Sequence, residues 1–580
     1  MKRIFIILLL SHATLPLFAQ KTPFECSKDK NTTATYAEIL SYYEQLDRKY
    51  EQLKIFTYGP TDIGKPLRLV VLSKSKLFDP IQIRKRNKCI LLINNGIHPG
   101  EPESIDASMM LCRDLLEKKL LPDSVVICII PVFNIGGCYN RGTSRANQNG
   151  PKTYGFAGNY QNLDLNADFI KTDSKNSFSF QQLFNLWQPD VLIDHHNGNG
   201  ADHQYVITLG ETQRDKLNPL LAEFMVNKME PALYYQMHQN GFEMAPLIKY
   251  DGKIPDTGIM SLLETPRSTT GYAALHNTIS FITETHKLKP FQKRVEASYQ
   301  FMKNLIAIMQ KQSASLLKVK AQANQQTCDQ KKFALNWEID KKKFETLLYK
   351  GYEAKYMKSE VSGVNRLFYD RNDPFARNIK WHNTYYPTAF AEKPVAYIIP
   401  QSWQKVIDLL KLNQVKMRRL KKDEAIDVSM YYILNYKTTP RPVEGHYMHS
   451  DVTLRVTHQK VQFYQGDYVV YVNQTKNRYI VETLEPQGVD SFFAWNFFDS
   501  ILDRKEYFST YLFEVDAGRL LHDNPGFRAQ LDKEVRRHPE MAKNSSAQLD
   551  WIYRNTDYSE KAYLRYPVGK LHTNAKFELY

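Results

Sequence analysis

The chain has 580 residues, of which 43% are hydrophobic, 12% aromatic and 24% charged. This composition excludes a disordered, collagen-like or disulfide-scaffold protein, because it supplies enough apolar surface for large cores. The length favours two or three domains. The formal net charge is +15, but the basic residues are scattered and form no recognisable nucleic-acid-binding module, so we expect no nucleic-acid partner.

The first residues predict export. Lys2 and Arg3 precede the apolar stretch 4–10, and Ala19 supplies a small residue before a cut, which is the pattern of a signal peptide over residues 1–19. The apolar stretch is too short to span a bilayer, so we expect no stable membrane insertion after the leader is removed. The short leader and only six cysteines favour the bacterial periplasm. Cys26 and Cys328 could pair, and the sequence leaves this open.

Short apolar runs alternate with helix-like segments over residues 35–315. Near-continuous apolar strands separated by helices predict an α/β domain whose sheet is flanked by helices on both faces. The runs are 89–94, 124–133, 190–194, 203–209 and 280–284.

The pattern changes in the second half of the chain. Residues 316–334 are polar and rich in glutamine, and we expect them to form a linker. Residues 335–500 combine strand-like runs with a helix and predict a mixed, β-rich domain of unknown role. Residues 501–580 are largely helical in character and predict a helical C-terminal region.

Polar side chains suited to a metal ion follow two of the apolar runs. His98 and Glu101 come after the first run, and His195 and His196 end the third. Open α/β sheets bind ligands at the carboxyl ends of their strands. Because side chains alternate along a strand, only one of the two adjacent histidines should reach the site, and we expect it to be His196. His98, Glu101 and His196 form a common ligand set for one catalytic Zn²⁺ ion. The alternative is a set of polar residues that merely cap the strands.

Glu284 ends the last apolar run of the first domain. A carboxylate at the end of an apolar strand is partly desolvated, which costs free energy unless the group is paired or used in catalysis. We therefore predict that Glu284 is a general base. Without a metal nearby, a locally hydrogen-bonded glutamate would be the simpler interpretation.

Taken together, these residues resemble the zinc carboxypeptidases of the carboxypeptidase A type over residues 35–310. The order His98-x-x-Glu101, then His196, then Glu284 is similar to that family's order of ligand pair, third ligand and catalytic base. The resemblance implies a mixed sheet flanked by helices on both faces. It also implies a metallopeptidase in which zinc-bound water attacks the carbonyl and Glu284 takes its proton.

Further motifs assign roles through the same resemblance. The segment Asp164-Leu165-Asn166 resembles the family's Asp-x-Asn element, which implies that Asp164 orients His98 and that Asn166 binds substrate. Arg145, in Ser-Arg-Ala-Asn-Gln-Asn-Gly, resembles the arginine that stabilises the oxyanion. Tyr272, in Thr-Gly-Tyr-Ala-Ala-Leu, resembles the tyrosine that covers the substrate.

One position departs from the family pattern. Ala167 stands where peptidase members have an arginine that grips the substrate's terminal carboxylate. Losing such a guanidinium forfeits hydrogen bonds worth about 1.5–3 kcal/mol. Arg267 could replace it as a substrate-binding residue, or could be a solvated loop residue. An endo-acting peptidase or an amidase is therefore as consistent with the sequence as strict removal of one C-terminal residue.

The sequence thus predicts an exported zinc metallopeptidase that acts on peptides or on peptidoglycan stem peptides. The alternative is a noncatalytic peptide- or glycan-binding protein on the same fold, which the replacement of the anchoring arginine by Ala167 permits. The sequence leaves the oligomeric state and the role of the second half open.

Overall fold

The fold is given by a computed structural model that describes the chain except for residues 1–19, 199, 248, 251–253, 256–257 and 574–576. The expected signal peptide therefore lies outside the described residues. Across the described part, no helix has both the length and the apolar character needed to cross a membrane. The six cysteines are free thiols, including Cys26 and Cys328, so the disulfide that the sequence leaves open is not formed in this structure.

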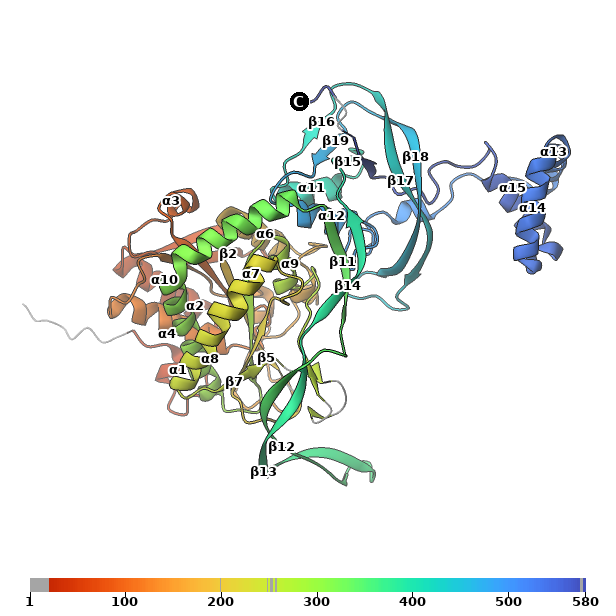
Figure 1. The fold of residues 1–580 in the computed structure, drawn as a ribbon. Helices are drawn as coiled ribbons and strands as arrows, with labels where there is room; N and C mark the ends of the chain where they lie inside the picture. The colour runs from red at the N-terminus through yellow and green to blue at the C-terminus, as the bar shows by residue number, and fades with distance from the viewer. Residues whose placement is uncertain (1–19, 199, 248, 251–253, 256–257, 574–576) are drawn as a thin grey trace, which may run out of the picture.

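A mixed eight-stranded sheet forms the centre of the first domain (Figure 1). The central strands β4, β3, β5 and β10 are parallel to one another, and the others add antiparallel pairs and one further parallel pair. Strands β3 and β4 are buried along their whole length, which explains their continuous apolar sequences. From one edge to the other the strands are β1 (Leu53–Pro60), β2 (Pro66–Leu72), β4 (Val125–Ile130), β3 (Cys89–Asn94), β5 (Val191–Gly198), β10 (Ile279–His286), β6 (Ile207–Glu211) and β7 (Met244–Pro246).

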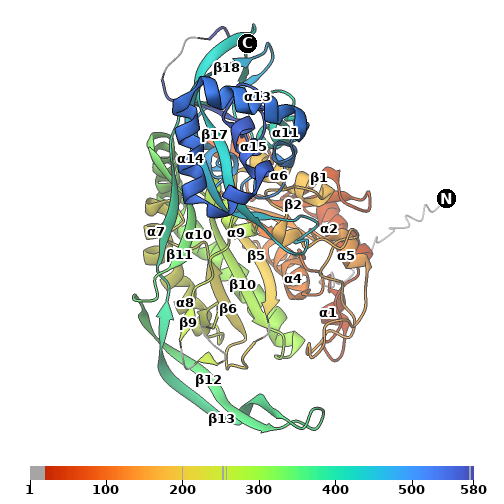
Figure 2. The same ribbon diagram turned by 90° about the vertical axis from the view of Figure 1, so that its right-hand side faces the viewer.

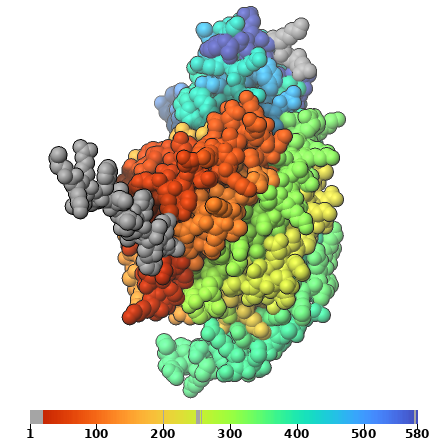
Figure 3. All heavy atoms as spheres, turned by 90° about the vertical axis from the view of Figure 1, so that its left-hand side faces the viewer, coloured from red at the N-terminus to blue at the C-terminus, as the bar shows by residue number. Residues whose placement is uncertain are grey.

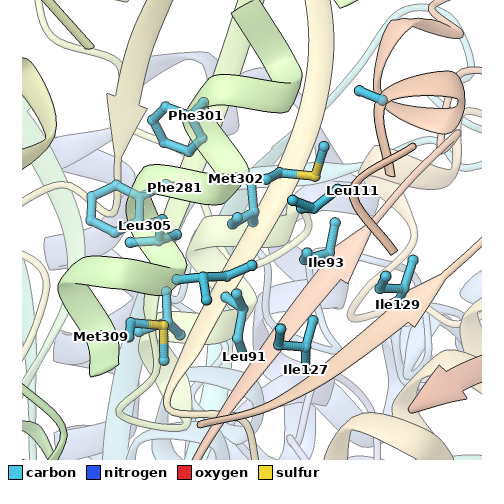
Figure 4. Close-up of a cluster of buried hydrophobic side chains, with 14 of the residues drawn as sticks. Leu91, Ile93, Leu111, Ile127, Ile129, Phe281, Phe301, Met302, Leu305 and Met309 are labelled. Carbon is cyan, nitrogen blue, oxygen red and sulfur yellow. The ribbon is translucent and has the colours of Figure 1, made fainter. Parts of the chain in front are cut away.

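Helices cover both faces of this sheet, which confirms the predicted fold class. One face packs against α2 (Tyr36–Lys49), α4 (Glu103–Glu117), α7 (Pro219–Phe224), α8 (Glu230–Gln239) and α10 (Phe291–Asp329). Figure 4 shows part of this core, where Met302 and Leu305 of α10 lie near Leu91 and Ile93 of β3. The other face packs against α6 (Lys175–Trp187), α9 (Thr269–Leu275) and the second half of the chain. Short helices in the connections are α1 (Pro23–Cys26), α3 (Pro80–Lys85) and α5 (Ile135–Tyr139).

Helix α10 occupies most of the segment for which the sequence predicts a linker, residues 316–334. The helix continues to Asp329, and β11 (Lys332–Ile339) begins soon after it. The prediction is wrong because Leu316, Ala323 and Thr327 recur at helical spacing and are buried, while polar residues cover the other side of the helix. With 39 residues at about 1.5 Å each, α10 extends for about 58 Å and carries the chain from the first domain into the second half.

The second half is rich in strands, as predicted, and contributes three further sheets. Strand β11 pairs with β14 (Tyr385–Glu392). Strands β12 (Glu345–Lys358) and β13 (Asn365–His382) form a long hairpin that joins β9 (Ile259–Met260) and β8 (Lys249–Tyr250) of the first domain and projects beyond it (Figures 2 and 3). The six-stranded sheet contains β16 (Arg418–Arg419), β19 (Tyr468–Tyr471), β15 (Ala396–Ile399), β20 (Gly569–Leu571), β17 (Glu424–Thr438) and β18 (His449–Phe463).

The predicted helical region, residues 501–580, is helical only in part. Helices α13 (Thr510–Asp523), α14 (Pro525–Arg537) and α15 (Ser545–Arg554) pack on one another and lie to one side of the rest of the molecule (Figure 1). The chain then returns, and β20 lies inside the six-stranded sheet between β15 and β17. The end of the chain is therefore part of the β-rich half.

The two halves of the chain share one hydrophobic core. Trp187 of α6 belongs to the same buried cluster as Ile407 of α11 (Gln404–Leu412), Tyr479 of α12 (Asn477–Leu484) and Trp495. The second half thus packs directly on one face of the first domain. This contact brings loops of the second half close to the residues that the sequence marks as functional.

Candidate metal centre

The predicted metal ligands lie at the carboxyl ends of neighbouring parallel strands. Strand β3 ends at Asn94 and is followed by the loop that carries His98 and Glu101, while His196 lies near the end of β5. Strand β5 pairs with β3 on one side and with β10 on the other, and the register places His196 opposite Glu284. The parallel topology therefore brings together residues that lie far apart in the sequence.

The three predicted ligands converge on one point. His98 Nδ1 lies 3.3 Å from His196 Nδ1 and 3.5 Å from Glu101 Oε1, and His196 Nδ1 lies 3.4 Å from Glu101 Oε2. One donor atom from each residue lies within 4.8 Å of the others. Donors bound at about 2.1 Å to a tetrahedral zinc ion are about 3.4 Å apart, so both the chemistry and the spacing of this group fit zinc.

In both His98 and His196, a carboxylate contacts Nε2, the ring nitrogen that faces away from the other ligands. His98 Nε2 lies 2.9 Å from Asp164 Oδ1, and His196 Nε2 lies 3.1 Å from Asp194 Oδ2. Thr269 donates to Asp194 at 2.6 Å and helps to fix that carboxylate. When a carboxylate accepts the Nε2–H, the lone pair of Nδ1 stays free for a cation. The contact of Asp164 with His98 is the one that the sequence motif predicts.

The charges of the group favour a cation at its centre. Burial would lower the pKa of His98, but Glu101 and Asp164 outweigh it and raise this pKa to about 9. Burial would raise the pKa of Glu101, but the neighbouring histidines and Arg145 hold it well below its usual range. The carboxylates therefore favour positive charge between these side chains, which is the charge that a metal ion brings.

His195 faces away from the centre, although it adjoins His196 in the sequence. Its Nδ1 lies 2.6 Å from Thr283 Oγ1, and its ring packs against Phe301. The side chain is buried, with 3% of its surface exposed, and burial lowers its pKa to about 3. The alternation of side chains along β5 thus brings only His196 to the centre, as the sequence indicates.

Arg145 lies beside the centre. Its Nη1 donates to Glu101 Oε1 at 2.6 Å. The Tyr154 hydroxyl accepts the backbone N–H of Arg145 and donates to its carbonyl oxygen, each at 3.0 Å, which fixes the loop. A guanidinium is therefore available next to the ligands.

Glu284 lies next to the ligands on β10. Its carboxylate passes so close to Gly198 that a side chain there would begin 2.1 Å from Glu284 Oε2 and would displace this carboxylate. Burial raises the pKa of Glu284 to about 7, with Glu101 and Glu264 adding to this effect and His196 opposing it. A carboxylate with this pKa can both accept and release a proton near neutral pH.

Asn166 lies next to the centre, but both polar atoms of its side-chain amide already form hydrogen bonds with neighbouring residues. Its Oδ1 accepts the N–H and the hydroxyl of Thr269 at 3.1 and 3.0 Å, and its Nδ2 donates to Glu264 Oε1 at 3.3 Å. A role in substrate binding stays a prediction. Sequence reasoning missed Glu264, which lies in a loop and follows no apolar run, and it did not assign Asp194 a role even though this residue shares a strand face with His196.

Tyr272 does not cover a substrate in this structure, so this prediction is corrected. The side chain is fully buried, with 0% of its surface exposed, and lies on α9 between the sheet and the second half. Its hydroxyl donates to Asn413 at 2.6 Å and accepts from Asn185 at 3.1 Å. The sequence motif is present, but the packing of α9 places the ring inside the hydrophobic core.

Arg267 pairs with a residue of the second half, so it is not the solvated loop residue that the sequence allows. Its Nη2 lies 2.6 Å from Asp490 Oδ1 and its backbone N–H donates to Asp490 Oδ2 at 2.8 Å. The guanidinium lies 4.8 Å from the ring centre of Trp495. Arg267 is therefore an ion-pair partner between the two halves, and its role in substrate binding stays a prediction.

An α/β domain with a His-Glu-His group at its strand ends offers a ligand set that catalytic zinc ions commonly have. Residues 39–242 match the model of the family described as zinc carboxypeptidase. This part of the chain is therefore similar to a zinc carboxypeptidase domain, as its motifs indicate. The matched residues include the three ligands and Arg145 but end before Glu284.

Solved structures of metallo-carboxypeptidases resemble the chain at low identity. A metallo-carboxypeptidase from Burkholderia cenocepacia is 12% identical, with 49% of this chain and 70% of that chain covered and a TM-score of 0.35. One from Pseudomonas aeruginosa is 12% identical, with 50% and 70% covered and a TM-score of 0.36. Carboxypeptidase A from Helicoverpa armigera is 13% identical, with 52% and 76% covered and a TM-score of 0.35. A search of the curated proteins found no match.

Proposed function

We propose that the protein is an exported zinc-dependent hydrolase of peptide or related amide bonds. The observation that carries the proposal is the convergence of His98, Glu101 and His196 on one point, with Glu284 opposite His196. The match of residues 39–242 to the zinc carboxypeptidase family supports the same conclusion.

In the proposed reaction, His98, Glu101 and His196 would hold a zinc ion, whose Lewis acidity would polarise the amide carbonyl and acidify water. Glu284 accepts a proton from the attacking water and delivers it to the leaving amine. Arg145 stabilises the negative charge that develops on the carbonyl oxygen. One C–N bond is broken and one C–O bond is formed, which gives a carboxylate and an amine.

The specificity that we propose does not depend on a terminal carboxylate of the substrate. Ala167 offers no guanidinium, and the next residue, Asp168, is fully buried in a pair with Lys171 at 2.7 Å. Arg267 is held by Asp490 and Trp495. We therefore favour an endo-acting peptidase or an amidase over an enzyme that removes single C-terminal residues.

The proposed location and substrates follow from the start of the chain. Lys2 and Arg3, the apolar stretch 4–10 and Ala19 have the order of a secretory signal peptide. In the bacterial periplasm, the available amide substrates include peptides and the stem peptides of peptidoglycan. The proposed partners are therefore these substrates.

A pool of peptides with free or amidated C-termini, together with peptidoglycan stem peptides, tests the function. We expect zinc-dependent cuts, mapped by mass spectrometry, that disappear with a chelator and return with zinc. An anchoring arginine would favour free-acid peptides by about 10–100-fold, whereas we expect the two sets to be cut within about threefold of each other. A protein that binds zinc and cuts no member of the pool would contradict the proposal and favour a noncatalytic peptide- or glycan-binding protein.

A further inference from the structure

We propose that Glu444, in the second half of the chain, is a positioning residue for the metal centre of the first domain. This inference rests on the proposed function, because it concerns the same zinc site. Glu444 Oε2 accepts the backbone N–H of Asp164 at 2.7 Å, although the two residues are 280 positions apart. Asp164 in turn holds His98 Nε2 at 2.9 Å. The second half is thus connected to a metal ligand through two hydrogen bonds.

Glu444 occupies the tip of a tight turn between β17 and β18. The N–H of Val443 donates to the carbonyl of His446 at 2.8 Å, and the reverse bond is 3.0 Å long. The φ angles of Glu444 and Gly445 are 47° and 83°. Two consecutive positive φ angles define a type I′ turn, which favours asparagine, aspartate or glycine at the first of these positions. A glutamate in this conformation is strained, and such strain persists where the surrounding contacts hold the residue in place.

The turn is anchored to the first domain next to its tip. His446 Nε2 lies 2.7 Å from Asp173 Oδ2, and the His446 ring contacts the Trp495 ring edge-on, with centroids 5.5 Å apart. Lys171 and Lys405 also pair with Asp173, each at 3.2 Å. The position of Glu444 relative to Asp164 is therefore set by contacts that do not involve Glu444 itself.

Asp164 needs such support because packing does not fix its side chain. The Asp164 side chain is 46% exposed, and its Oδ1 accepts both His98 Nε2 and the N–H of Asn166, each at 2.9 Å. Its backbone starts the 3-10 turn over Leu165–Ala167. By holding the Asp164 N–H, Glu444 fixes the backbone from which this carboxylate extends. The direction of the His98 ring then depends on a residue of the second half.

The variant Glu444→Gly separates positioning from folding. Glycine removes the carboxylate but adopts positive φ angles without strain, so we expect an unchanged or higher melting temperature. Loss of a direct partner of a metal ligand costs about 10–100-fold in metal affinity, and for this indirect partner we expect the zinc Kd to rise about 3–10-fold. Glu444→Gln keeps an acceptor oxygen, and we expect its Kd to stay within about twofold of the wild type.

Zinc affinity is measured on the metal-free full-length protein by competition with a chelator, and the exchange of the Asp164 amide is followed by hydrogen–deuterium exchange. We expect faster exchange at Asp164 in Glu444→Gly. The exposed Glu360, in the turn between β12 and β13, provides the matched control Glu360→Gly, which should change neither quantity.

Wild-type zinc affinity and wild-type Asp164 exchange in Glu444→Gly would overturn the inference and leave the proposed function intact. A wild-type protein that binds no zinc in the same titration would instead contradict the proposed function, and the inference would fail with it.

Discussion

Replacing Glu284 with glutamine is expected to lower kcat for peptide hydrolysis by about 10²–10⁴-fold, the usual contribution of a general base. Glutamine keeps the size and the hydrogen-bonding groups of Glu284 but cannot accept a proton from water. Because Glu284 is not one of the three converging ligands, the variant should still bind one zinc ion per chain. The measurement pairs kcat on the best-cut peptide with metal analysis of the same sample.

Glu211→Gln is the matched control for this variant. Glu211 ends β6, the strand beside β10, and its pKa is raised by burial, as that of Glu284 is. It does not belong to the metal group, so its loss should leave kcat unchanged. If Glu284→Gln kept kcat within about tenfold of the wild type, the role of general base would have to move to another residue.

Replacing His196 with alanine is expected to remove zinc, whereas replacing His195 is not. His196 Nδ1 faces His98 and Glu101, while His195 Nδ1 is bonded to Thr283. Losing a partner of a ligand costs about 10–100-fold in affinity, so losing a ligand should raise the zinc Kd by more than about 100-fold. Isothermal titration of the metal-free variants measures both constants.

His195→Ala also serves as the stability control. Removing its bond to Thr283 and its packing on Phe301 should cost about 1–3 kcal/mol of unfolding free energy, with zinc affinity close to that of the wild type. The reverse result, in which His195→Ala loses the metal and His196→Ala keeps it, would assign the third ligand to His195.

The sequence predicts the residues of the centre well, because the patterns that mark them lie within short segments of the chain. Alternation along β5 separates His196 from His195, and the apolar runs mark the strands at whose ends His98, Glu101 and Glu284 lie. None of these inferences needs knowledge of the second half. The sheet with helices on both faces follows from the same runs, since strands buried on both faces must be continuously apolar.

The predictions that fail depend on contacts between distant segments. Tyr272 matches a family motif and Arg267 is a candidate replacement for the missing anchor, but their surroundings come from Asn413, Asp490 and Trp495 of the second half. The polar composition of residues 316–334 does not distinguish a linker from a helix with one buried stripe. Nothing in the local sequence indicates that a turn between β17 and β18 reaches Asp164.

These contacts connect the second half to the candidate metal centre, which its own sequence does not indicate. It covers one face of the eight-stranded sheet through a shared core, and it places the turn at Glu444 next to Asp164. The centre is therefore built by both halves of the chain, although its proposed ligands all come from the first domain.

The central claim is that one zinc ion is bound by three side chains from separate parts of the first domain. A crystal structure of the zinc-loaded protein, with diffraction recorded at the zinc absorption edge, tests it directly. We expect one anomalous peak per chain at about 2.0–2.2 Å from His98 Nδ1, His196 Nδ1 and a carboxylate oxygen of Glu101. A peak bound by other residues, or no peak at this position in protein saturated with zinc, would contradict the account.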